Sequence, residues 1–538
     1  MKHRHLWKKV GALLLTCVLA LTACNRETQK PESLPRYTVP TTVEGQKLFV
    51  SSQKVDSMDD SSWEPTTETT DIVPAEDDLA QELLSLPGVV KVGRKNIGNL
   101  KYDENQYLVY YEMPIDHNDP SKGTFTQRMY LNYKGNDAPN VFYIGGYNLY
   151  YGINDERETE LAAKYNCNFF EPEYRFDGGS MPDGFSPTET DYWEYLNCAQ
   201  ASEDFHSMIE GLKTIFNGKW CIEGISKGGE FTVYQAGKHP EDADLYVAEA
   251  AMLKCNNGYP GLYEYMYTKA GDDTYGKDQA KEYRDMVLAF QVELIKNRDV
   301  LEERYWKEAT EKYGMTFSST FTKELLFDCT VLDLNYIWQF ALEEEFESIK
   351  MTMEMKPKDG ETDKTKQENF YSKAISTMTD LYGPWQYAVK ERWLAPEEGQ
   401  IYNYLFQCAT EDGYYAYDFS YLRKALEKDG SGASLFVTED MEKDLYLLRL
   451  DEKHQQTFPY NDEACRIRCR AVEETQKPLI LVNPTTDVHY VAEIKESSNP
   501  NVHIFPVIGG GHGDAEISYL TEKQFQEYDQ VVKQALGL

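Results

Sequence analysis

The sequence predicts an α/β fold, in which a mostly parallel sheet has helices on both faces and carries a large helical insertion. Three observations indicate this fold. Short apolar runs typical of strands alternate with helical patterns before residue 255, similar strands return after residue 478, and the intervening chain has apolar residues at helical spacing. Strands that alternate with helices are typical of parallel sheets, because each crossover helix covers a face of the sheet.

The expected elements of the sheet follow one another in this alternating order. Strands are predicted at residues 107–113, 124–133, 140–144, 168–171, 219–223 and 245–251, with a helix over 190–216. The C-terminal part adds strands at 478–482 and 502–508 and a closing helix over 522–536. The two groups of strands are expected to form one α/β core.

The insertion is expected to form a helical cap. Apolar residues recur at helical spacing over 283–294 and 334–342, whereas 356–366 is a polar loop. The insertion leaves the core after a strand end, so we expect it to lie over the carboxyl edge of the sheet. The core then divides into residues 84–255 and 478–538, on either side of a cap at 256–477.

The N-terminus has the pattern of an export signal. Basic residues precede an apolar run at 10–21 that is shorter than a typical membrane span. The run ends in Leu21-Thr22-Ala23-Cys24, which is similar to a bacterial lipobox, so 1–23 is predicted to be a lipoprotein signal peptide and Cys24 the lipidated residue. The alternative is an ordinary secretory signal. The protein is expected outside the cytoplasm, lipid-anchored to a bacterial membrane, at the cell surface or in the periplasm.

Composition limits the partners. Residues 24–83 are polar and rich in proline, which predicts a disordered tether. The formal charge of −35 argues against nucleic acid and against adhesion to anionic lipid, so membrane contact is expected only through Cys24. Eight cysteines between residues 167 and 469 leave disulfide pairing open. No motif indicates a metal or a cofactor, and His206 and His239 are interpreted as structural residues in a helix and at a helix end.

The pattern Gly224-Ile225-Ser226-Lys227-Gly228 predicts a nucleophile elbow, the tight strand-to-helix turn that exposes a serine hydroxyl. A strand-like run precedes it and a helical run follows it. The glycines fit because a Cβ on either flank of so crowded a turn would clash. Ser226 is therefore the candidate nucleophile.

A serine needs a base to take its proton and an acid to orient that base. His512, on a glycine-rich loop after the last strand, and Asp487, after the strand before it, follow Ser226 in the required chain order. His489 is the alternative base and Asp514 the alternative acid. All three predicted side chains would project from the same edge of the sheet.

The oxyanion of an acyl-transfer intermediate needs two backbone N–H donors. Lys227, directly after the nucleophile, is expected to supply one. The other is expected from Gly146 or Tyr147, in the loop after strand 140–144. The alternative is that these glycines only turn the chain.

Several segments resemble the serine peptidases of family S37. They are 113–117 (MPIDH), 122–125 (KGTF), 146–148 (GYN), 171–176 (EPEYRF) and 224–229 (GISKGG). The resemblance implies an α/β-hydrolase fold with a helical cap, as in secreted bacterial tripeptidyl and prolyl aminopeptidases. It implies acyl-enzyme hydrolysis of peptides near a free N-terminus, often after proline, with a cap carboxylate binding the substrate ammonium. Tyr174 stands where the family usually has histidine, and Asp487-Val488-His489 where it has Asp-Pro-Trp.

The sequence leaves some alternatives open. Glu343, Glu344 and Glu345 are candidates for the ammonium site, although three adjacent acids are more typical of a solvated helix face. The triad does not distinguish peptides from esters, so an esterase or lipase on the same fold is the second hypothesis and an inactive binding lipoprotein the third. Peptides are the expected partners, and the oligomeric state is not predicted.

Overall fold

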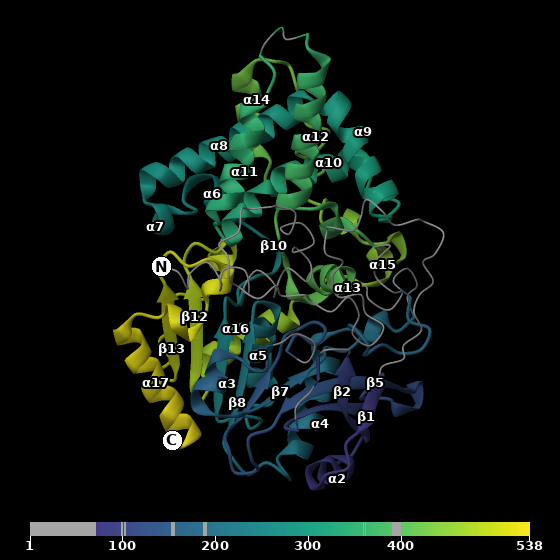
Figure 1. Cartoon of the computed structure of the whole chain (residues 1–538), viewed down its shortest axis with the longest axis vertical. Coiled ribbons are helices and arrows are strands. Elements are labelled where there is room, and N and C mark those ends of the chain that lie inside the picture. Colours follow the sequence, from purple (N-terminus) through teal and green to yellow (C-terminus); the bar gives the residue numbers. More distant parts are fainter. Residues whose placement is uncertain are drawn as a thin grey trace.

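The computed structural model describes residues 71–97, 100–101, 104–151, 156–186, 191–358, 360, 362–389 and 400–538. Figure 1 shows two layers along the long axis, with a sheet and its flanking helices below and the helical insertion above. The large sheet has the strand order β1-β2-β4-β5-β7-β6-β8-β9-β12-β13, and β3 pairs with β2. From β7 to β13 all neighbours are parallel, whereas the pairs on the β1 side are antiparallel.

The sheet has an antiparallel half and a parallel half. The first half of the sheet consists of β1 (Asp71–Pro74), β2 (Val89–Ile97), β3 (Leu100–Lys101), β4 (Gln106–Pro114), β5 (Thr124–Asn132) and β7 (Asn168–Pro172). The second half consists of β6 (Asn140–Tyr143), β8 (Trp220–Ile225), β9 (Leu245–Glu249), β12 (Leu479–Pro484) and β13 (Val502–Val507). In β6, β8, β9 and β12 every residue is buried, as expected of strands covered on both faces.

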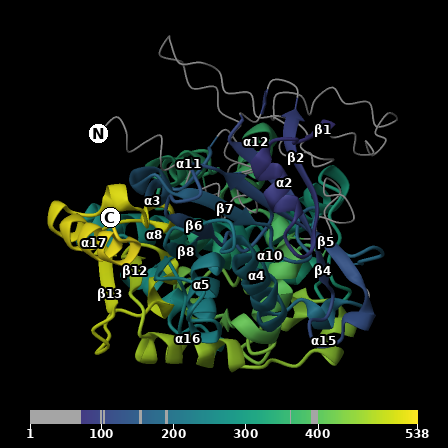
Figure 2. The same cartoon turned by 90° about the horizontal axis from the view of Figure 1, so that it is seen from below.

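Helices cover both faces of the sheet, as Figure 2 shows from below. One face packs on α2 (Asp78–Leu84), α4 (Cys198–Leu212), α5 (Lys227–Lys238) and α16 (Glu463–Glu474), and the other on α3 (Glu160–Tyr165) and α17 (Glu522–Leu536). The fold is therefore an α/β hydrolase with a helical insertion, as predicted.

The closing helix α17 illustrates how the sequence specifies an element. The Thr521 hydroxyl accepts a hydrogen bond from the Gln524 N–H, and the Gln524 side chain accepts one from the Thr521 N–H, which together form a capping box. Tyr528, Val532 and Leu536 recur every fourth residue and are buried. Gly537 ends the helix in the left-handed conformation. The predicted bounds, 522–536, are the observed ones.

The insertion is helical, with only the two short strands β10 (Asn257–Tyr259) and β11 (Tyr414–Tyr415) among its described residues. Its α-helices are α6 (Leu262–Thr268), α7 (Asp272–Tyr275), α8 (Lys277–Lys296), α9 (Arg298–Lys307), α10 (Lys323–Asp333), α11 (Glu343–Glu354), α12 (Lys364–Leu381), α13 (Gln400–Gln407), α14 (Ser420–Asp429) and α15 (Glu452–Thr457). The helical pattern over 334–342 begins as a 3₁₀ helix, Leu334–Gln339, rather than as an α-helix.

Two predicted boundaries differ from the structure. The tether was expected to reach residue 83, but β1 pairs with β2, and α2 buries Leu79 and Leu83 in the core. The cap was expected to reach residue 477, but α16 lies against α5, where Ile467 and Ala471 approach Gly237. The helices α2 and α16 are short and polar on one side. Their apolar sides are recognised as core-facing only when the elements that they pack against are known.

The predicted signal peptide, with Cys24, and most of the predicted tether lie outside the described residues and stay predictions. Of the helices that the structure describes, none combines the length and the apolar character needed to span a bilayer. The eight cysteines from Cys167 to Cys469 are free thiols, and all but Cys469 are buried.

Buried carboxyl groups lie between the sheet and α3. Burial raises the pKa of Glu223 to about 8, although the Thr159 hydroxyl donates a hydrogen bond to it at 2.6 Å. Burial and the charge of Glu223 also raise the pKa of Glu249, on the next strand, well above its usual value. The folded protein therefore holds protons here that the unfolded chain releases near pH 4.5.

This difference predicts how stability depends on pH. The unfolded chain loses these protons at lower pH than the folded protein does. The contribution of Glu223 to the free energy of unfolding is therefore fully present below pH 4.5 and is lost as pH rises toward about 8. In Glu223→Gln the fall in Tm between pH 5 and pH 8 should be smaller than in the wild type, as measured by calorimetry. The control is Glu344→Gln, an exposed residue on α11. Parallel Tm curves for wild type and Glu223→Gln would contradict the prediction.

Candidate active site

Ser226 lies in a sharp turn between β8 and α5. Its backbone has φ 56° and ψ −124°, a strained conformation for a residue with a side chain. A Cβ on Gly228 would lie 1.8 Å from the Ile144 carbonyl oxygen, and one on Gly224 would lie 2.5 Å from the Gly228 carbonyl oxygen. Only glycine fits at these two positions, which explains the pattern of the elbow.

His512 and Asp487 meet at the carboxyl edge of the sheet. Asp487 follows β12, His512 follows β13, and both side chains are fully buried. His512 Nδ1 lies 2.6 Å from Asp487 Oδ2, and the second oxygen of Asp487 accepts the His489 N–H at 3.1 Å. Asp514 instead accepts the Gly511 N–H at 2.9 Å. The carboxylate that orients His512 is therefore Asp487.

Ser226 is at the same edge, because β8, β9, β12 and β13 are consecutive parallel strands. Among the described residues, His512 Nε2 is buried and has no hydrogen-bond partner, so the bond from the Ser226 hydroxyl is not formed in this structure. Catalytic hydrogen bonds are often long before substrate binds. The free Nε2 is the nitrogen that a serine base needs, since Nδ1 is held by the acid.

The loop after β6 lies directly against the first turn of α5. Gly146 has φ 80°, and a Cβ on it would lie 3.1 Å from the Gly228 nitrogen and 3.2 Å from Lys227 Cγ. Lys227 is the first residue of α5, and the N–H groups of a first helical turn have no partner within the helix. The predicted oxyanion donors at Lys227, Gly146 and Tyr147 are thus brought together beside Ser226.

The side chain of Lys227 is a feature that the sequence did not indicate. It is 2% exposed, and its Nζ lies 4.0 Å from the ring centroid of Tyr174 and 4.9 Å from that of Tyr147. Among the described residues it has no hydrogen-bond partner. Burial raises the pKa of nearby Asp177 to about 7, although the positive charge of Lys227 acts to lower it. A cation held by aromatic faces beside the loop of Gly146 and Tyr147 favours negative charge there.

A cavity of about 90 Å³ lies between the core and the cap. His489 lines it, and its ring lies 5.4 Å from the ring of His512. Burial lowers the pKa of His489 to about 4, and its Nδ1 lies 3.1 Å from the Tyr415 hydroxyl. His489, weighed as an alternative base, is therefore a neutral wall residue. Eight tyrosines also line the cavity: Tyr263, Tyr336, Tyr382, Tyr404, Tyr414, Tyr415, Tyr417 and Tyr446.

The charged residues of the cavity wall are Glu230, Asp333, Asp412 and Arg449. The Arg468 guanidinium lies 3.0 Å from Glu230 and 2.8 Å from Asp412. Asp333 accepts hydrogen bonds from the hydroxyls of Tyr263 and Tyr387, each at 2.6 Å, and burial raises its pKa to about 6. Glu343, Glu344 and Glu345, at the start of α11, do not line this cavity.

The cap contacts the loops that carry the base and the acid. A Cβ on Gly511 would lie 2.9 Å from the carbonyl oxygens of Gln339 and Phe340, in the cap. The Thr274 hydroxyl of α7 donates a hydrogen bond to the Gly509 carbonyl at 2.9 Å and lies 2.7 Å from the Thr486 hydroxyl. The glycine-rich loop around His512 is thus packed between the sheet edge and the insertion.

The chain is similar to known peptidases. The model of the family described as PS-10 peptidase S37 matches residues 72–388. The chain belongs to peptidase family S37. This S37 chain is 32% identical over 289 residues to the prolyl tri/tetrapeptidyl aminopeptidase of Streptomyces mobaraensis. The aligned region covers 53% of this chain and 56% of that protein.

A second similar protein is from a plant. The chain is 24% identical over 185 residues to the probable serine protease EDA2 of Arabidopsis thaliana, covering 32% of this chain and 36% of that protein. The alignments thus span about half and about a third of the two relatives. Among solved structures, an α/β fold family hydrolase from Bacillus anthracis is similar with a TM-score of 0.30 and 14% identity, and the match covers 80% of this chain and 99% of that one. A proline iminopeptidase from Mycobacterium smegmatis is similar with a TM-score of 0.33 and 10% identity, and the match covers 80% of this chain and 97% of that one.

Proposed function

We propose that the protein is a serine exopeptidase that removes short peptides from a free N-terminus through an acyl-enzyme on Ser226. The observation that carries the serine mechanism is the buried His512–Asp487 pair at the sheet edge where the nucleophile elbow ends. His512 Nε2 takes the proton of the Ser226 hydroxyl as that oxygen attacks the scissile carbonyl. Asp487 fixes the tautomer, with the proton on Nδ1, and stabilises the imidazolium that forms.

The oxyanion loop and Lys227 support the next step. The negative charge of the tetrahedral intermediate develops beside the N–H groups of Lys227 and of the 146–147 loop. His512 then gives its proton to the leaving amine, and the C–N bond breaks to leave the N-terminal fragment esterified to Ser226. Water, deprotonated by the same nitrogen, hydrolyses the ester and regenerates the serine.

The charge of the cavity supports the N-terminal mode. Three carboxyl groups line it together with one guanidinium, and Glu230 and Asp412 share a second guanidinium, that of Arg468, so one carboxyl group remains to pair with a cation such as a substrate ammonium. Glu230 is four residues after Ser226 on α5, which is about 6 Å along a helix. A peptide with its ammonium in this cavity would present a carbonyl near its N-terminus to the nucleophile. The name of the Streptomyces relative points to the same mode.

Matched peptides with a free and an acetylated N-terminus test this proposal. Acetylation removes the positive charge that would balance the remaining carboxyl group of the cavity, so kcat/KM should fall at least about 100-fold. Products are identified by mass spectrometry, with Ser226→Ala as the blank. Di- or tripeptides released only from the free peptides are the expected result. Equal cleavage of both peptides would contradict the N-terminal mode, and rapid hydrolysis of short acyl esters without peptide cleavage would indicate an esterase.

A further inference from the structure

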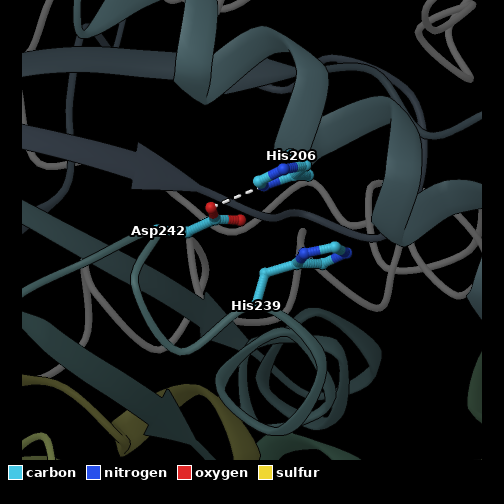
Figure 3. Close-up of side chains that lie close together, drawn as sticks. All are labelled: His206, His239 and Asp242. Atoms are coloured by element: carbon cyan, nitrogen blue, oxygen red, sulfur yellow. Dashed lines mark hydrogen bonds and ion pairs between the residues drawn. The ribbon is translucent and has the colours of Figure 1, made fainter.

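Two histidines and an aspartate lie close together (Figure 3). They are between the end of α5 and the start of β9, so they lie at the edge of the sheet opposite the active site. His206 is on α4, His239 ends α5, and Asp242 is in the turn that leads to β9. The imidazole rings are stacked, with centroids 4.0 Å apart and planes 10° apart. His206 Nδ1 lies 2.7 Å from Asp242 Oδ1. The sequence placed these histidines in separate structural roles, because their proximity depends on how α4 packs beside α5.

The three side chains offer donors of the type that transition metals prefer. One ligand atom from each residue lies within 4.8 Å of the others. Two imidazoles and a carboxylate are a common ligand set for Zn²⁺ and its neighbours in the first transition row.

A buried hydrogen-bond chain orients the carboxylate. The Gln235 side-chain amide donates to Asp242 Oδ2 at 2.6 Å, and the Ser202 hydroxyl donates to the Gln235 amide oxygen at 2.7 Å. Asp242 is 1% exposed, so its position is fixed. Glu203 Oε1 lies 3.1 Å from His239 Nε2 and adds a fourth group of the right chemistry. Such support behind a ligand is what metal sites need to hold their geometry.

We propose that His206, His239 and Asp242 form a binding site for a divalent transition-metal ion of the Zn²⁺ type. A metal lies in the plane of each imidazole that binds it, so one of the two parallel rings must turn. The side chains have room to do so, because His206 is 35% and His239 18% exposed. The ion replaces the His206–Asp242 hydrogen bond, and each imidazole coordinates through its unprotonated nitrogen.

The ion would join two helices rather than take part in hydrolysis. α5 has 12 residues, so its His239 end is about 18 Å from the Ser226 end. The ligand atoms of Asp487, His489 and His512 also lie within 4.8 Å of one another, but these residues belong to the active site. The third such group, Cys198 with Glu411 and Asp412, has the Arg468 guanidinium 2.8 Å from Asp412, which opposes a second cation.

Equilibrium dialysis of the full chain against Zn²⁺ tests the proposal. The variants are His206→Gln and His239→Gln, and the control is His503→Gln on β13, outside the group. We expect His206→Gln and His239→Gln each to weaken one equivalent of Zn²⁺ binding at least about tenfold, and His503→Gln to leave it unchanged. Other metal-binding residues of the chain are common to all variants, so they cancel in the comparison.

Thermal unfolding gives a second readout that does not depend on peptidase activity. Zn²⁺ should raise the Tm of the wild type and of His503→Gln, but not of His206→Gln or His239→Gln, because an ion that binds only the folded state stabilises it. Circular dichroism without metal establishes that each variant is folded. Equal Zn²⁺ stoichiometry, affinity and Tm shift in all four proteins would overturn the proposal, whatever the outcome for the proposed function.

Discussion

Replacement of Ser226 by alanine is expected to lower kcat for peptide hydrolysis by about six orders of magnitude. The elbow presents one hydroxyl at the carboxyl edge of the sheet, and alanine removes the oxygen that forms the acyl-enzyme. The backbone is little disturbed, because alanine keeps the Cβ that the turn already accommodates. The measurements are kcat on a free N-terminal peptide and covalent labelling by an organophosphorus probe, located by mass spectrometry.

The matched control for this prediction is Ser207→Ala. Ser207 is an exposed serine on α4, so its loss should change neither kcat nor labelling. Wild-type protein should carry one probe molecule on the peptide that contains Ser226. Undiminished labelling or turnover in Ser226→Ala would show that another nucleophile acts, and the serine mechanism would then be wrong.

The second large effect is expected at Asp487. Changing it to asparagine should lower kcat about 10⁴-fold, because the amide donates to Nδ1 and stabilises the tautomer that carries its proton on Nε2. That tautomer cannot accept the serine proton. The 2.6 Å contact and the complete burial of both side chains leave no water to replace the carboxylate. The change is measured as kcat at saturating peptide.

The neighbouring carboxylate gives the comparison for Asp487. Asp514→Asn keeps an oxygen that accepts the Gly511 N–H, so its effect on kcat should stay within about tenfold. If Asp514→Asn reduced kcat as strongly as Asp487→Asn, the assignment of the acid would fail. The two substitutions have the same chemistry in adjacent loops, so a large difference between them reports the contact with His512.

Much of the core could be predicted because its information is local. Each short apolar run bounded by polar residues became a strand, and the elbow pattern placed Ser226 between β8 and α5. The pairing of His512 with Asp487 followed from chain order, since parallel strands bring their carboxyl ends to one edge. Glycines at 224 and 228 also carried geometric information, because only the crowded turn requires them.

What the sequence did not indicate depends on distant packing. The helix α16 belongs to the core because it packs against α5. The side chain of Lys227 is buried against two tyrosines that come from other loops. The sequence indicates His489 only as an alternative base, because nothing in its neighbourhood along the chain shows that it faces the cap. The stacked His206 and His239 are 33 positions apart, and no local pattern brings them together.

The contacts of Gly509 and Gly511 with the insertion bear on how such a protein can be reduced in size. Excising residues of the upper layer to obtain a minimal hydrolase would leave the loop that carries His512 without one of its two walls. A truncated domain of this kind is expected to fold its sheet yet turn over substrate poorly. The upper layer is in this respect a scaffold for the His512 loop as well as a wall of the cavity.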